Sequence, residues 1–188
     1  MKYKIKKEID YMDIESLVSK LESKDLIYKK VMRRFQILFF IFIFFYAGLF
    51  LVNPDPDITT NDRIAGACYV IAFSLFTWQF RKNYKKFKTI NYFDPVKKVL
   101  EDAEKRYRLW QKNIFIVGSA VFLIDVASLF VLYDRFIKRW SFWEFFTGVQ
   151  LVYILAIGLG FTIGYIKWKV ENKPIWLSAK KLLKELEE

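Results

Sequence analysis

Histidine is absent from this chain, and cysteine occurs only once, at Cys68. Without histidine, the catalytic triads that use it as a base and most zinc and haem sites are excluded. A single cysteine cannot form an intramolecular disulfide. The apolar runs also lack a pair of acids or a nucleophile next to a base. We therefore predict a non-enzymatic protein with no catalytic residue, no metal site and no cofactor.

Charge is almost missing from four stretches, although charged residues make up 27% of the chain. These stretches cover residues 35–52, 64–80, 113–133 and 145–166, and Asp125 is the one charged residue within them. About 20 helical residues cross a hydrocarbon core of about 30 Å. The third and fourth runs are long enough, whereas the first two need flanking aromatic or basic side chains to complete the span. The predicted fold is all-α, with four transmembrane helices arranged as two hairpins.

The segment between the two predicted hairpins, residues 81–112, carries eleven Lys or Arg residues and four Asp or Glu residues. Short loops rich in Lys and Arg stay in the cytoplasm, because moving their charges across the membrane is costly. Each hairpin returns the chain to the side it left, so both ends should also be cytoplasmic. We expect a multi-pass protein of the cytoplasmic (inner) membrane. Its predicted parts are an amphipathic helix (1–34), the first hairpin (35–80), a basic linker with a helix (81–112), the second hairpin (113–166) and a second amphipathic end (167–188).

Basic side chains gather where the apolar runs meet the polar segments. The residues expected to contact lipid headgroups are Arg33, Arg34, Arg81, Lys82, Lys85, Lys86 and Lys112. This position suits an anionic inner leaflet. Since membrane flanking explains both these cations and the aromatic residues between them, we do not predict nucleic-acid binding.

The polar segments before, between and after the hairpins show amphipathic helical spacing. Asp13 is placed to cap the first such helix, and Asp94 to cap the central one, which we expect to continue into the third apolar run. Residues 97–104 and 180–187 resemble each other, and each follows a proline. This similarity indicates a parallel internal repeat, with chance likeness of Lys-, Glu- and Leu-rich helices as the alternative. Their apolar stripes need a cover: lipid headgroups, one another, or another protein.

Asp125 lies about eight residues from the outer end of the third run. A carboxylate near the centre of a membrane helix costs about 2.5–3.5 kcal/mol on insertion scales, so it should face protein or water. Tyr153 of the fourth run is expected at a similar depth, with Gln150 one turn nearer the surface. Asp125 then either fastens helices together by hydrogen bonds or takes part in proton- or cation-linked transport.

Glycines in the fourth run provide a candidate packing surface. They are Gly158, Gly160 and Gly164, and the last two form a small-xxx-small pair that lets two helix backbones approach closely. The pair suits packing within the chain and pairing with a second copy equally well.

These features favour an integral membrane scaffold or regulatory subunit. Its cytoplasmic helices would contact a partner in a membrane complex or the inner leaflet. The alternative is a small transporter or channel subunit coupled through Asp125, which would need a homo-oligomer, because four helices enclose little space.

Overall fold

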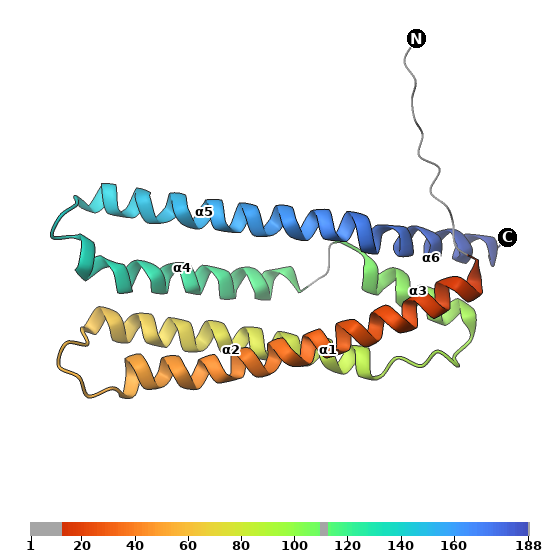
Figure 1. Ribbon diagram of the computed structural model, residues 1–188, viewed down its shortest axis with the longest axis horizontal. Coiled ribbons are helices and arrows are strands. Elements are labelled where there is room, and N and C mark those ends of the chain that lie inside the picture. Colours follow the sequence, from red (N-terminus) through yellow and green to blue (C-terminus); the bar gives the residue numbers. More distant parts are fainter. Residues whose placement is uncertain (1–12, 110–112, 188) are drawn as a thin grey trace, which may run out of the picture. The chain divides into compact units, whose positions relative to one another are not determined.

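The computed structural model describes residues 13–109 and 113–187, and every regular element in that part of the chain is helical (Figure 1). The elements are α1 (Ile14–Tyr46), η1 (Ala47–Val52), α2 (Thr60–Lys88), α3 (Val96–Tyr107), α4 (Ile114–Phe136), α5 (Phe142–Lys167), η2 (Trp168–Asn172) and α6 (Lys173–Glu185). The elements η1 and η2 are π-helical turns that directly continue α1 and α5. The all-helical fold class is confirmed.

Within the described residues, three helical stretches are long and apolar enough to cross a membrane: Ile14–Val52, Ile114–Phe136 and Phe142–Glu185. They contain the first, third and fourth apolar runs. The second run lies in α2, where Arg63 and Arg81 bound a shorter apolar stretch. By length and composition, the chain has the character of a membrane protein.

Residues 14–34 of the predicted first amphipathic segment join the first apolar run in one continuous helix, formed by α1 and its extension η1. Residues 1–12 of that segment lie outside the described residues. Asp13 caps the start of α1 as expected, because the backbone N–H of Ser16 donates to the Asp13 carboxylate over 3.1 Å. The helix crosses residues 34 and 35 without a break.

The central helix, α3, differs in two ways from the expectation. Pro95 occupies the N-cap position, while the Asp94 carboxylate pairs with the Lys98 ammonium at 2.7 Å. The helix ends at Tyr107, because Arg108 adopts an extended conformation with ψ of 138°. The prediction that this helix continues into the third run is therefore wrong.

The chain divides into two compact units. The first, here called the apolar unit, comprises residues 27–89 and 113–161 of the described chain, and so holds most of α1, α2, α4 and α5. The second, the terminal unit, comprises residues 13–26, 90–109 and 162–187.

Small side chains of α2 and α4 are fully buried in the apolar unit. Ala65 and Ala72 of α2 are fully buried, as are Ala120 and Ala127 of α4. Small residues at the interface between two membrane helices let the helix backbones approach closely. This agrees with the small-residue content of the second run.

Aromatic rings join α1 to α2. Phe39 stacks on Phe73, Phe76 and Phe80 with ring centroids 4.9–5.9 Å apart. The opposite face of α1, including Phe44, is exposed. One face of the first run thus packs on protein, while the other face is free to contact lipid.

The terminal unit has its own apolar core. The buried apolar residues are Leu17 and Leu21 of α1, Val99, Leu100, Ala103 and Tyr107 of α3, and Ile175, Ala179 and Leu183 of α6. Full burial of a leucine or isoleucine stabilises by about 1.5–3 kcal/mol. The apolar stripes of these three amphipathic segments therefore cover one another. Contact with one another was one of the three expected ways of burying them.

Candidate functional site

A buried carboxylate organises the polar interior of the terminal unit. Asp25, on α1, is 3% exposed. The Tyr92 hydroxyl donates to its Oδ2 at 2.5 Å, and the Tyr107 hydroxyl donates to its Oδ1 at 2.8 Å. The Arg106 guanidinium forms an ion pair with Oδ2 at 3.0 Å. We call these four residues the Asp25 cluster.

The Asp25 cluster satisfies the needs of a buried charge. An isolated carboxylate is very costly to bury, whereas one paired with a cation and hydrogen-bonded is tolerated. Burial, and then the hydrogen bond to Asp25, raise the pKa of Tyr92 far above its ordinary value. Tyr92 therefore remains protonated and continues to donate.

Two further polar contacts fasten η2 within the terminal unit. The Trp168 indole N–H donates to the backbone carbonyl of Tyr107 at 2.9 Å. The Lys24 ammonium donates to the Glu171 carbonyl at 3.0 Å and pairs with its carboxylate at 3.3 Å. The beginning, middle and end of the chain are thus linked by side-chain contacts around one cluster.

The burial of Asp25 was not predicted from the sequence, because an acidic residue in a basic, polar segment is expected at the surface. The available signal was its position in the helical stripe. Asp25 follows Leu17 and Leu21 at four-residue steps, so it lies on the face that becomes buried.

The structure brings Asp125 and Gln150 together in the apolar unit. Asp125 is 9% exposed, and the Gln150 amide nitrogen donates to both of its carboxylate oxygens at 3.0 Å. The Tyr153 hydroxyl donates to the Val121 carbonyl, one turn before Asp125 on α4. Asp125 therefore faces protein, as its burial cost requires.

A second polar contact lies along the same face of α4. The hydroxyl groups of Tyr69, on α2, and Ser128 are 3.2 Å apart. Hydrogen bonds between membrane helices stabilise their association by about 0.6–2 kcal/mol each. The arrangement around Asp125 is suited to joining α4 with its neighbours.

Space is open where a side chain would begin at three of the α5 glycines. A methyl group added at Gly158, Gly160 or Gly164 would have no heavy atom within 4 Å, apart from the helix's own backbone. None of residues 151–167, the apolar part of α5, is buried. Contact of this surface with a second copy stays a prediction.

The predicted headgroup-contacting residues of α1 and α2 are not buried: Arg33, Arg34, Arg81, Lys82, Lys85 and Lys86. Lys112 lies outside the described residues. The Arg33 guanidinium sits 5.5 Å from the Tyr84 ring centre, and the Lys82 ammonium 5.4 Å from that of Trp78. Such contacts orient cations beside aromatic rings. We call these six residues the basic band.

No protein-family model, curated protein or solved structure matches this chain. Among the described residues, no group of three or more acids or cysteines is placed to hold a metal ion. The candidate functional features of this chain are the Asp25 cluster, the Asp125–Gln150 contact, the basic band and the terminal unit.

Proposed function

We propose that this protein crosses the cytoplasmic membrane four times and serves as a non-enzymatic scaffold or regulatory subunit. The basic segment 81–112 and both chain ends lie in the cytoplasm. There the terminal unit contacts a protein partner, and the basic band contacts the anionic inner leaflet.

One observation carries the topology: three segments separated by apolar runs share a single core in the terminal unit. Residues 13–26 precede the first run, residues 90–109 come after the second, and residues 162–187 comprise the end of the fourth run together with η2 and α6. Polar segments that pack together must lie on the same side of a bilayer. If α1 crosses the membrane, α2 has to return the chain, and α4 and α5 form the second crossing pair in the same way. This supports four spans although α2 is the least apolar.

Cysteine labelling tests the topology. In a Cys68→Ser background, single cysteines at Asp57, Lys138 and Asp102 probe the two short loops and α3. We expect a membrane-impermeant maleimide to label the first two positions in intact cells, and the third only after permeabilisation. Labelling of position 102 in intact cells would contradict the proposed orientation.

The same packing supports the scaffold role. The apolar stripes of the amphipathic helices are buried against one another, so a partner would contact the outer surface of the terminal unit instead. Exposed charged residues of this unit, such as Lys97, Asp102 and Lys180, stand beside exposed apolar ones, such as Phe93 and Val96. Such a mixed surface suits a reversible contact rather than an obligate apolar interface. The Asp125–Gln150 contact supports helix fastening rather than transport.

Copurification in mild detergent tests this role. We expect proteins that copurify with the natural chain to be reduced at least several-fold by Asp25→Ala, which removes the central acceptor of the terminal unit. Glu22→Ala, an exposed change one turn earlier, should leave them unchanged. Quantitative mass spectrometry provides the readout, and an identical protein set with all three chains would rule out a scaffold that acts through this unit.

A further inference from the structure

Cations gather without nearby acids where α1 and α2 leave their apolar runs. Residues 26–54 and 63–88 contain no Asp or Glu. Within the apolar unit, the Lys and Arg residues beside these two runs are Lys29, Lys30, Arg33, Arg34, Arg81, Lys82, Lys85, Lys86 and Lys88. None of them forms an ion pair with a residue of the ranges 13–109 and 113–187. Their charge is therefore open to an anion from outside the chain.

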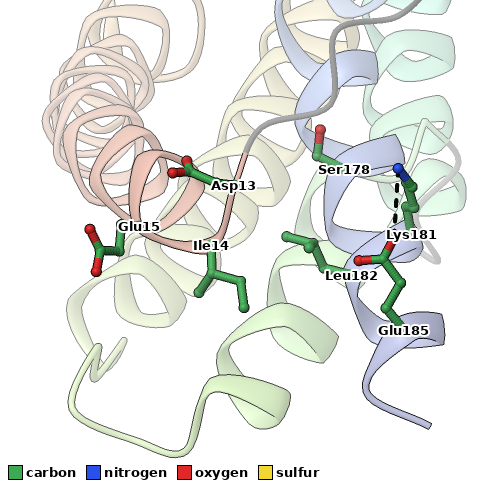
Figure 2. Close-up of a pocket in the computed structure, with 7 residues that line it drawn as sticks. All are labelled: Asp13, Ile14, Glu15, Ser178, Lys181, Leu182 and Glu185. Atoms are coloured by element: carbon green, nitrogen blue, oxygen red, sulfur yellow. Dashed lines mark ion pairs between the residues drawn. The ribbon is translucent and has the colours of Figure 1, made fainter. Parts of the chain in front are cut away.

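Ion pairs are present elsewhere in the same chain. In the terminal unit, the Lys97 ammonium lies 3.3 Å from the Glu187 carboxylate. Figure 2 shows a further pair on α6, where Lys181 lies 3.6 Å from Glu185. The cations at the ends of α1 and α2 differ from these lysines, because no carboxylate of their own unit is close in sequence or paired with them.

Arg33 links the cations of the two helices. Its guanidinium lies 5.5 Å from the centre of the Tyr84 ring on α2, and its Nη1 donates to the Gln36 side-chain oxygen at 3.1 Å. Three cations of α2 lie within one turn of Tyr84, at spacings that put them on its face of the helix. We call the following residues the Tyr84 cluster: Arg33, Arg81, Tyr84, Lys85 and Lys88.

Ring contacts fix the spacing of α1 and α2 on both sides of this cluster. Tyr28 stacks on Phe87 with ring centroids 5.8 Å apart, and Phe35 stacks on Phe80 with centroids 5.3 Å apart. A ligand loses less affinity to ordering when the groups that bind it are already held in place. The cations of the Tyr84 cluster are thus presented by a fixed pair of helices.

The Tyr84 cluster lies at the depth expected for lipid headgroups. Arg81 directly follows the second apolar run, and Lys85 is about 6 Å further along the helix. The headgroup region on one side of a bilayer is about 5–8 Å thick. On the side of the lipid tails, Phe35 and Ile37 of α1 are exposed and offer apolar contact to acyl chains.

The number and distribution of the cations favour a headgroup with two phosphates. One phosphodiester carries a single negative charge, whereas the Tyr84 cluster has four cations on two helices. Arginine binds phosphate oxygens through two parallel N–H donors, and lysine adds a point charge. Two phosphates joined by a short linker can contact both helices and offset more of the charge. Basic sites between membrane helices on the cytoplasmic side are suited to such headgroups.

We propose that the Tyr84 cluster binds one phospholipid with a two-phosphate headgroup, of the cardiolipin type, at a fixed place on the chain. Arg33 holds one phosphate, Arg81 and Lys85 hold the other, and the acyl chains lie along Phe35 and Ile37. This inference rests on the proposed function, which places these helix ends at the anionic inner leaflet. It adds a single selective site to the general attraction of the basic band.

Lipid titration of the full chain in neutral detergent micelles tests the proposal, and native mass spectrometry counts the lipids bound per chain. The probes are cardiolipin, and phosphatidylglycerol at twice the concentration so that the phosphate charge is equal. We expect one cardiolipin per chain, bound at least about tenfold more tightly than phosphatidylglycerol. Inorganic pyrophosphate, which has two phosphates but no acyl chains, should not displace it.

Matched variants locate the binding. Arg81→Gln with Lys85→Gln removes two cations of the cluster and should weaken cardiolipin binding about tenfold. Lys82→Gln with Lys86→Gln removes the same charge at the same depth, but from a different face of α2, and should change binding less than about twofold. Arg33→Lys keeps the charge and should still weaken binding several-fold, because an ammonium lacks the planar fork.

Three results would overturn the proposal. They are equal effects of the two double variants, equal affinity for the two lipids at equal phosphate charge, and displacement of cardiolipin by pyrophosphate. Equal, large losses from both double variants would leave the leaflet contact of the basic band intact and exclude only the fixed site. No loss from either double variant would contradict the leaflet contact as well, so the two failures are distinguishable.

Discussion

Asp25→Ala is expected to lower the free energy of unfolding of the terminal unit by about 3–5 kcal/mol, the usual cost of breaking a buried ion pair. The change removes the carboxylate that accepts from Tyr92 and Tyr107 and pairs with Arg106. The Arg106 side chain is 15% exposed, so water compensates for little of the lost charge partner.

Amide hydrogen exchange in mild micelles measures this effect, with peptides from α3 and α6 as reporters. Glu22→Ala is the matched control, since it removes one carboxylate from an exposed position on the same helix. Asp25→Ala with Arg106→Met should recover part of the loss, because no uncompensated charge is then buried. Protection equal to that of Glu22→Ala would show that the cluster does not hold the unit together.

Gly66→Leu is expected to disrupt the packing of α2 on η1. A Cβ at Gly66 would overlap the Cβ of Phe50 and approach Leu51 at 3.3 Å. The Phe50 Cβ is fixed to its backbone, so relief requires η1 itself to move. Even Gly66→Ala should cost about 1–3 kcal/mol through overpacking, and the larger leucine should cost more.

Gly118→Ala is the matched control for this prediction. It lies within α4, and an added methyl there would meet no heavy atom within 4 Å beyond the helix's own backbone. Alanine favours a helix over glycine by about 1 kcal/mol, so this variant should be unchanged or slightly more stable. Thermal unfolding in micelles compares the two alanine variants, and equal midpoints would contradict the close contact of Gly66 with Phe50.

Local sequence pattern determined the helices. Apolar runs, proline breaks and the Asp13 cap act through residues within a few positions of one another, so their effects can be read along the chain. The same kind of reasoning predicted that Asp125 avoids lipid, because the cost of a bare carboxylate in hydrocarbon does not depend on which partner it finds. The extent of α3 was misjudged at its C-terminal end, where Arg108 leaves helical geometry.

Tertiary structure alone decided which groups meet. The donors to Asp25 lie 67 to 82 residues away, and Gln150 lies 25 residues from Asp125. The amphipathic stripes have the same spacing whether they cover lipid, a partner or one another, and only their packing distinguishes these outcomes. Gly66 and Gly160 are both glycines in apolar helices, yet Phe50 packs against the first and no described side chain approaches the second. Spacing determines which face of a helix is apolar, whereas the identity of its neighbour depends on contacts between segments far apart in the chain.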